Sequence, residues 1–284
     1  MMTKVKFKLE SAGYCEAKQS HVLRGTSSKT IKFYATYGHI EHPIYGHILF
    51  DSGYTKRFYE VTKKLPFKLY AKLTKVFVTE KEEAINKLKK KGVDSSDIKY
   101  IIVSHFHADH IGGLKDFPKA KFICSEDAYN DIRNKKGVLA LKKGFIPALM
   151  PEDFLARTQL ISFKNKTKKI EGLGNVIDLF DDESILICQL DGHAKGQIGA
   201  IINAEKKTFL ISDAAWLIEN YTNLHLPSHS VRLFFNSWRD FKDSLQRVHL
   251  YSKAYPETII IPCHCEKTYR KLTNLEWKYL KHLY

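Results

Sequence analysis

The stretch Ile101–Gly113, which reads IIVSHFHADHIGG, decides the fold. Its apolar, β-branched start predicts a strand over Tyr100–Ser104. The next six residues include four side chains that are able to bind a metal ion, namely His105, His107, Asp109 and His110. Imidazole and carboxylate groups suit zinc and related divalent ions. A strand that runs directly into such a cluster, closed by two glycines, predicts a metal site at one end of a β-sheet.

Three further potential ligands also stand just after apolar runs. His193 ends the segment LDGH, Asp213 ends LISD, and His264 lies within IPCHC. Loops at strand ends often carry binding and catalytic side chains. We therefore expect all three to meet the 105–110 segment in the folded chain.

The cysteines are Cys15, Cys124, Cys188, Cys263 and Cys265. Their odd number and irregular spacing disfavour a disulfide scaffold and favour a reducing, cytoplasmic setting. Cys124 and Cys188 lie in apolar runs and are predicted to be buried strand residues. A thiolate at Cys263 or Cys265 could enter the metal shell, but we expect both to alternate away from it along the strand.

Length and composition indicate a globular protein. The chain has 284 residues, 44% hydrophobic and 27% charged, which excludes wholesale disorder. No apolar run reaches the roughly 18 residues that span a bilayer, so we expect no membrane segment. The start, MMTKVKFKLE, lacks the continuous apolar region of a signal peptide. These features predict a cytoplasmic location.

The formal charge of +15 raises the question of an anionic partner. Only 8 of the 46 basic residues are Arg, which is the residue favoured for bidentate phosphate contacts. The Lys residues are dispersed along the chain rather than clustered as in nucleic-acid binders. We therefore expect a small-molecule substrate rather than nucleic acid.

Strands and helices are predicted along the whole chain, as a layered α/β fold in one domain over residues 1–284. We expect helices within 54–79 and at Glu80–Lys91, Glu126–Arg133, Trp238–Tyr251 and Leu272–Leu283. Strands are expected at Val5–Leu9, Ile31–Tyr37, His47–Phe50, Tyr100–Ser104, Lys121–Cys124, Ile185–Leu190, Ile198–Asn203, Thr208–Ile211 and Thr258–Ile261.

Residues 134–183 mix apolar side chains with Pro147 and Pro151 and predict an inserted cap or lid. The apolar side chains of this stretch are Phe145, Ile146, Leu149, Met150 and Phe154. If they face a pocket, they favour a partly hydrophobic substrate. The alternative is a packing element at the surface.

The motifs resemble those of the metallo-β-lactamase superfamily of binuclear metal hydrolases. The resemblance rests on HxHxDH at 105–110, on the DGHxxG context of His193, on Asp213 in SDA and on His264 near the end. It covers about residues 30–270 and implies an αββα sandwich of two mixed β-sheets flanked by helices.

The resemblance also implies the ligand set of two divalent metal ions. His105, His107 and His193 would bind the first ion, Asp109, His110 and His264 the second, and Asp213 would bridge them. Asp109 would also orient the attacking water, and Asp51, in an FDSG turn, would orient a ligand histidine from outside the metal shell. For Asp51 a simple turn residue is the alternative. Zinc is the expected metal, with iron or manganese as alternatives.

Departures from the family pattern reduce the number of activities that the resemblance allows. Asp213 resembles the glyoxalase II and lactonase branches, and His107 disfavours the oxygen-reducing di-iron branch, which typically has Glu there. The lactonases carry a Tyr three residues after the bridging Asp, where this chain has Trp216. Other candidate donors to the substrate are Tyr54, Tyr221, His225 and His229, for each of which packing or surface placement is the alternative.

We therefore predict a metal-dependent hydrolase that acts on a small ester, lactone or thioester through metal-activated hydroxide. One alternative is a phosphodiesterase or nuclease of the same fold, which the basic charge would suit. The other is a binding or regulatory protein that has lost catalysis.

Overall fold

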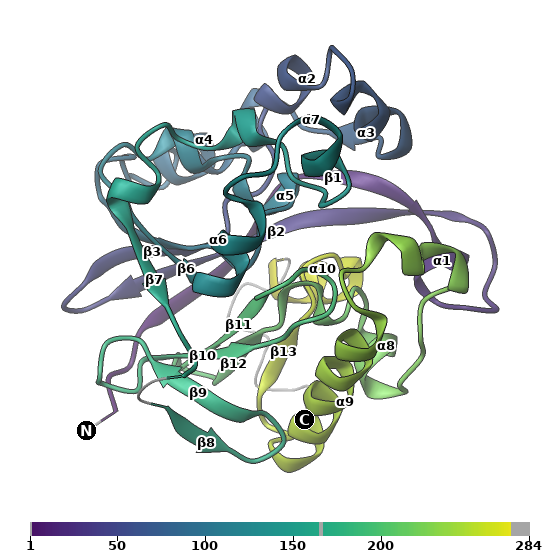
Figure 1. The fold of residues 1–284 in the computed structure, drawn as a ribbon. Helices are drawn as coiled ribbons and strands as arrows, with labels where there is room; N and C mark the ends of the chain where they lie inside the picture. Colours follow the sequence, from purple (N-terminus) through teal and green to yellow (C-terminus); the bar gives the residue numbers. More distant parts are fainter. Residues whose placement is uncertain (1, 165–166, 274–284) are drawn as a thin grey trace.

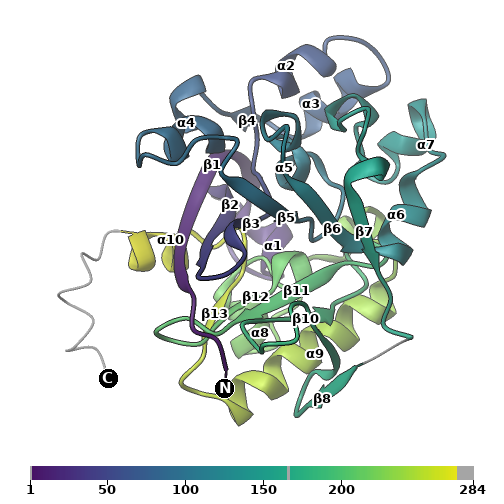
Figure 2. The same cartoon turned by 90° about the vertical axis from the view of Figure 1, so that its left-hand side faces the viewer.

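The computed structural model describes residues 2–164 and 167–273, and the polypeptide forms two mixed β-sheets that lie face to face (Figure 1). Helices cover the outer side of each sheet, and the view from the side shows the resulting αββα layers (Figure 2). The predicted fold class is therefore confirmed. Within the described residues, the helices are all too short or too polar to cross a membrane.

The first sheet has the strand order β4-β1-β2-β3-β5-β6-β7. Its strands are β1 (Lys6–Lys18), β2 (Thr30–His42), β3 (Gly46–Phe50), β4 (Val76–Phe77), β5 (Ile98–Ile102), β6 (Lys121–Ser125) and β7 (Thr158–Ile161). Strands β1 to β3 form antiparallel pairs, whereas β3, β5, β6 and β7 run parallel. Because parallel strands end at the same edge, the loops that follow β3 and β5 lie side by side.

The second sheet has the order β13-β12-β11-β10-β9-β8. Its strands are β8 (Lys168–Ile170), β9 (Gly174–Asp178), β10 (Ile185–Gln189), β11 (Ile198–Ile202), β12 (Thr208–Leu210) and β13 (Ile259–Ile261). Strands β12 and β13 pair in parallel, so the loops that follow these two strands reach one edge together.

The helices connect and cover the strands. The α-helices are α1 (Gln19–Val22), α2 (Arg57–Val61), α3 (Phe67–Leu73), α4 (Ala84–Lys89), α5 (Ala108–Ile111), α6 (Glu126–Ile132), α7 (Gly137–Leu141), α8 (Ile218–Thr222), α9 (Trp238–Ala254) and α10 (Glu266–Thr273). Short 3-10 helices occur at Glu80–Glu82, Leu114–Asp116, Pro147–Leu149, Leu155–Arg157, Ser212–Ala214 and His229–Phe234.

Alternation along the strands builds two separate apolar layers. In β6, Ile123 faces the layer between the sheets, whereas Phe122 and Cys124 face the helices. In β11, Ile198 and Ile202 face inward in the same way. Successive strand residues point to opposite faces, so a continuous apolar run is what a strand covered on both sides requires.

Two expectations about the elements need correction, and a third is not tested. Residues Glu80–Lys91 do not form one helix, because the backbone at Glu83 turns to ψ 144° and separates a 3-10 turn from α4. Residues 54–79 contain two short helices and strand β4. The helix expected at Leu272–Leu283 lies outside the described residues from position 274 onward.

The stretch 134–183 is not a single inserted cap. Its second half supplies β7 at the edge of the first sheet and β8 and β9 at the edge of the second. The first half, around α7, approaches the 105–110 segment. There Gly144 adopts φ +62° and passes so close to His107 that a Cβ atom would lie 2.6 Å from the ring.

Candidate metal centre

The HxHxDH segment turns sharply at the end of β5. The Ser104 N–H donates to Asp51 Oδ1 over 2.8 Å, which fixes the chain where it leaves the strand. Helix α5 then starts after His107 and carries Asp109 and His110 on its first turn. A strand end followed by one helical turn thus directs neighbouring side chains to a common point.

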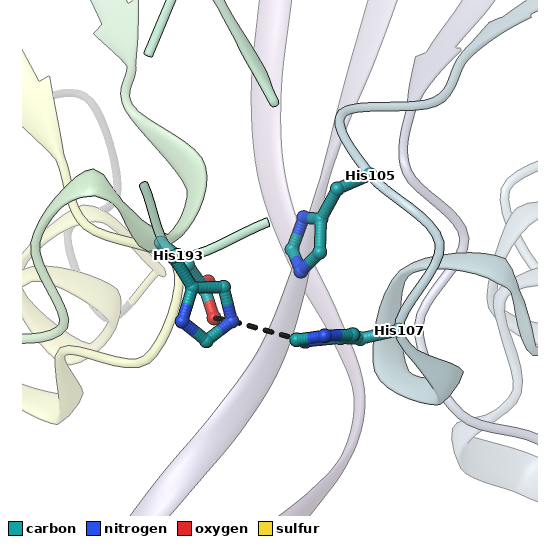
Figure 3. Close-up of side chains that lie close together, drawn as sticks. His105, His107 and His193 are labelled. Carbon is teal, nitrogen blue, oxygen red and sulfur yellow. Dashed lines mark hydrogen bonds and ion pairs between the residues drawn. The ribbon is translucent and has the colours of Figure 1, made fainter. Parts of the chain in front are cut away.

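The first donor group comprises His105, His107, His193 and Asp213, whose candidate ligand atoms all lie within 4.8 Å of one another. In the close-up the three imidazoles point toward one another from two different sides of the fold (Figure 3). The Nε2 atom of His193 lies 2.9 Å from His107 Nδ1 and 2.9 Å from Asp213 Oδ2. The expected long-range convergence of His193 and Asp213 on the 105–110 segment is present.

The second donor group comprises His110, Asp213, Cys263 and His264, again within 4.8 Å. Asp109 adjoins it, with Oδ2 3.4 Å from His110 Nε2 and 3.5 Å from His264 Nε2. Sequence reasoning placed Cys263 away from the site, and the structure places it in this group. The loop after β13 ends the strand alternation at Ile261, so the alternation rule does not apply to Cys263.

Asp213 belongs to both groups and divides its oxygens between them. Oδ2 faces His193, whereas Oδ1 lies 3.5 Å from His110 Nε2 and 3.3 Å from His264 Nε2. The indole N–H of Trp216 donates to Oδ2 over 3.3 Å. A carboxylate with one oxygen toward each donor group is arranged to bridge two cations.

In three of the histidines, the Nδ1 atom has a hydrogen-bond partner in the protein. His110 Nδ1 lies 2.7 Å from Asp51 Oδ2, His264 Nδ1 lies 2.8 Å from the Tyr34 carbonyl, and His105 Nδ1 lies 3.1 Å from Ser104 Oγ. Such partners fix the ring orientation of metal-ligating histidines. They leave the Nε2 atoms directed at the cluster.

The buried nitrogens of the cluster are short of partners. His105 Nε2 and His110 Nε2 have no hydrogen-bond partner among the described residues, although both atoms are buried. Buried polar atoms are nearly always satisfied. An orphaned imidazole nitrogen in a set of carboxylate and imidazole donors therefore fits a divalent metal ion.

The pKa shifts divide the cluster into two parts. Burial would lower the pKa of His110 and of His264, but Asp109 and Asp51 raise that of His110, and Cys263 and Asp213 raise that of His264, well above the usual value. Burial and neighbouring imidazoles lower the pKa of His107 to about 3 and that of His105 well below its usual value. Burial opposes ionisation of Asp109, but attraction to His110 and a hydrogen bond with it lower the pKa of Asp109 to about 2. Neutral imidazole and ionised carboxylate are the forms that bind metals.

Asp51 supports the cluster from outside, as the sequence predicted. It is fully buried, and its Oδ2 accepts from Ser104 Oγ over 2.8 Å as well as contacting His110. Its φ of +63° is a conformation that Asp and Asn tolerate better than most residues. Asp51 is thus a turn residue and a partner of a candidate ligand at once.

The candidate substrate contacts have a range of partners. Tyr54 is buried against Phe58, and the Tyr221 carbonyl accepts from His249. His225 Nε2 contacts the Arg24 carbonyl, and His229 contacts the Arg24 side chain. Of the five candidates, Trp216 is the one whose side chain hydrogen-bonds a candidate ligand within the described residues.

A pocket of about 160 Å³ opens beside His107 and His193. Its aromatic walls are Phe106, Phe234 and Phe235, and the charged side chains of Asp131 and Lys195 line it as well. The stretch 134–183 contributes Lys142 and Lys143 to the lining, and not the apolar side chains from which a hydrophobic pocket was expected.

Those apolar side chains belong to the core instead. Phe145, Ile146, Leu149 and Phe154 are buried, and the ring of Phe154 stacks on Phe122. Of the two interpretations of this stretch, packing is the one that the structure supports. Phe234 and Phe235 were missed because they lie in a short apolar run, RLFF, with no motif to mark it.

Comparison with known families identifies the chain. The model of the metallo-beta-lactamase superfamily matches residues 44–211, which is more than half of the sequence. The chain belongs to the metallo-beta-lactamase superfamily. The match includes the HxHxDH segment and His193 and ends just before Asp213.

Curated relatives of this superfamily member include N-acyl homoserine lactonases. The lactonase AttM of Rhizobium radiobacter is 24% identical over 189 residues, and the match spans 64% of this chain and 65% of AttM. An N-acyl homoserine lactonase from Bacillus sp is 28% identical over 148 residues, covering 51% of this chain and 50% of the relative. The chain thus matches about half to two thirds of the length of these relatives.

Solved structures share the fold over nearly the whole chain. An N-acyl homoserine lactone hydrolase with N-hexanoyl-L-homoserine at its catalytic metal centre matches 95% of this chain and 97% of its own, with a TM-score of 0.71 and 19% identity. The dizinc quorum-quenching lactonase AidC matches with a TM-score of 0.63 and 14% identity, covering 94% of this chain and 89% of AidC. These likenesses establish the shared architecture.

Proposed function

We propose that this protein is a binuclear metal-dependent hydrolase that opens the ring of lactones, with short-chain N-acyl homoserine lactones as the substrate class. The observation that carries the proposal is Asp213, whose two oxygens face two separate groups of buried imidazole nitrogens. The activity of the related lactonases supplies the substrate class.

The donor set fits two divalent ions with one residue in common. His105, His107 and His193 would hold the first ion, Asp109, His110 and His264 the second, and Asp213 both. A bound pair of divalent ions polarises a carbonyl oxygen and lowers the pKa of water to about 7. Asp109, whose Oδ2 lies at the rim of the second group, would orient the attacking water.

Trp216 distinguishes this site from that of the lactonases it resembles. Its indole N–H already donates to Asp213 Oδ2. We infer that Trp216 holds the bridging carboxylate in place and does not polarise the substrate carbonyl, so the metal pair alone would do so.

The pocket beside His107 and His193 would take the acyl group. The aromatic part of its lining, Phe106, Phe234 and Phe235, suits an alkyl chain, and the charged part includes Asp131 and Lys195. Its volume of about 160 Å³ is below the roughly 300–1,000 Å³ of typical ligand pockets. The substrate we favour therefore carries a short acyl chain.

Ring opening releases one proton for each ester bond cleaved, so a pH-stat measures it directly. We expect zinc-loaded protein to hydrolyse N-hexanoyl homoserine lactone and to lose this activity after chelation. His105→Ala should abolish turnover, whereas His21→Ala, which changes an exposed histidine on α1, should not. Zinc-loaded protein that leaves the lactone intact would contradict the proposal.

The same assay decides between the remaining alternatives. A thioester and bis-p-nitrophenyl phosphate are tested alongside the lactone. Hydrolysis of the phosphodiester alone would favour a phosphodiesterase, and no turnover of any substrate would favour a binding protein. We also propose a cytoplasmic location, because all five cysteines are buried and free.

A further inference from the structure

Cys263 lies in the second donor group with its thiol directed at Asp213. The Cys263 N–H donates to the Ser212 carbonyl over 3.4 Å, and the Cys263 carbonyl accepts from Thr36 Oγ over 2.7 Å. The residue is thereby held from two sides, and its thiol contacts Asp213 Oδ1. Its side chain also interacts with His110 and His264.

Ordinary core packing does not account for this position. Cys15, Cys124 and Cys188 belong to the main apolar cluster, whereas Cys263 and Cys265 are buried outside it, with Cys263 5% exposed. Its surroundings are a carboxylate and two imidazoles. A thiol in such a polar, buried setting is placed for coordination rather than for packing.

A second observation points to a ligand at the same place. His110 is buried, and its Nε2 has no hydrogen-bond partner among the described residues. This nitrogen lies 3.5 Å from Asp213 Oδ1, the oxygen that the Cys263 thiol contacts. His264 Nε2 lies 3.3 Å from that oxygen as well. One carboxylate oxygen, two imidazole nitrogens and one sulfur therefore surround the same small volume.

We propose that Cys263 is a thiolate ligand of the second metal ion. The proposal rests on the proposed metal centre and makes it chemically asymmetric. The first ion would have three imidazoles and the Asp213 carboxylate, and the second would have two imidazoles, the carboxylates of Asp109 and Asp213, and sulfur. On binding, the thiol loses its proton to solvent and a sulfur–metal bond forms.

The thiolate has a consequence for the choice of metal. Soft thiolate ligands favour zinc, whereas carboxylate and water suit manganese. Cys263 would therefore bias the second position toward zinc, while the first position, with nitrogen and oxygen donors only, would discriminate less. It would also add a negative charge that reduces the net charge of the filled site.

Cobalt substitution tests the proposal in the full-length protein. Protein loaded with two equivalents of Co²⁺ should show a near-ultraviolet band from thiolate-to-cobalt charge transfer in addition to the visible bands of the ion. Cys263→Ser should lose the near-ultraviolet band and keep the visible bands. Its affinity for the second cobalt should fall by about 10- to 100-fold or more, since loss of an outer-shell partner alone costs that much.

Cys265→Ser is the matched control. Cys265 is equally buried two residues further on, and its carbonyl accepts from Tyr269 N–H within α10. This variant should keep both sets of bands. A wild-type protein that binds two cobalt ions without the charge-transfer band would overturn the proposal, as would a band that persists in Cys263→Ser.

X-ray absorption of the zinc-loaded wild-type protein provides a test that needs no variant. We expect a sulfur neighbour of zinc at about 2.3 Å. A shell of nitrogen and oxygen alone overturns the role of Cys263 and leaves the metal centre standing. A chain that binds neither cobalt nor zinc contradicts the proposed function itself, so the two failures are distinguishable.

Discussion

Replacing Asp51 by Asn tests how the second metal position is built. Asp51 accepts from Ser104 N–H through Oδ1 and from Ser104 Oγ through Oδ2, and Oδ2 also contacts His110 Nδ1. Asn keeps the size of the side chain and tolerates the φ of +63° at this position. It can accept from the Ser104 backbone, but its NH₂ group then faces His110 Nδ1 and no longer accepts a proton from it.

The tautomer of His110 is what changes. A carboxylate at 2.7 Å favours the tautomer with the proton on Nδ1, which leaves Nε2 as the nitrogen that would bind a metal ion. In Asp51→Asn this preference is lost. Loss of such an outer-shell partner typically costs about 10- to 100-fold in metal affinity, which is about 1.4–2.7 kcal/mol. We expect a larger loss at the second position than at the first, because Asp51 contacts His110 directly but reaches His105 only through Ser104 Oγ.

Competition against a chromophoric chelator measures the two zinc affinities in turn. Asp153→Asn, which changes an exposed carboxylate paired with Arg157, is the control and should bind zinc as wild-type protein does. Equal weakening of both zinc ions in Asp51→Asn, or no weakening of either, would refute the reasoning.

Three other perturbations give sharp expectations. The free energy of unfolding in urea should be roughly 3 kcal/mol lower for Gly192→Ala than for Gly174→Ala. Both glycines have positive φ, but a Cβ atom at Gly192 would lie 1.9 Å from the Phe241 nitrogen, whereas one at Gly174 would have no neighbour within 4 Å. Burial and the neighbouring His47 lower the pKa of His39 to about 4. Below pH 6.5 His39 therefore takes up a proton in the unfolded state but stays neutral in the folded state. The free energy of unfolding of wild-type protein should fall by up to about 3 kcal/mol between pH 6.5 and pH 4. In urea titrations at several pH values, His39→Gln should show a smaller fall. Trp216→Phe removes a hydrogen bond to a carboxylate, which contributes about 1.5–3 kcal/mol, and should lower kcat/KM for the lactone by about 10- to 100-fold. The control Trp238→Phe should change kcat/KM less than about threefold. Equal effects of the two substitutions would show that Trp216 only packs.

The parts of the fold that sequence could predict are those with local causes. The apolar runs at β5, β6, β10 and β11 are covered on both sides by other layers, so their composition alone identifies them as strands. The HxHxDH segment also predicts its role from sequence alone, because four potential metal ligands in six residues have few purely structural explanations.

The parts that sequence could not predict depend on tertiary context. Strands β7 and β8 are edge strands, and β9 lies next to β8 at the same side of its sheet. All three are short and partly exposed, so they have no strong apolar pattern. The end of β13 at Ile261 decides that Cys263 faces the donor group, and no pattern in IPCHC marks that end. Phe234 and Phe235 reach the pocket through the position of their loop and not through any spacing.

Metal content per chain tests the central claim most directly. After loading with zinc and dialysis, elemental analysis of wild-type protein should find two ions per chain. His105→Ala should retain the ion of the second group alone, and His264→Ala the ion of the first group alone. A wild-type content of one ion or none, or two ions that survive both substitutions, would contradict a pair of metal ions shared by Asp213.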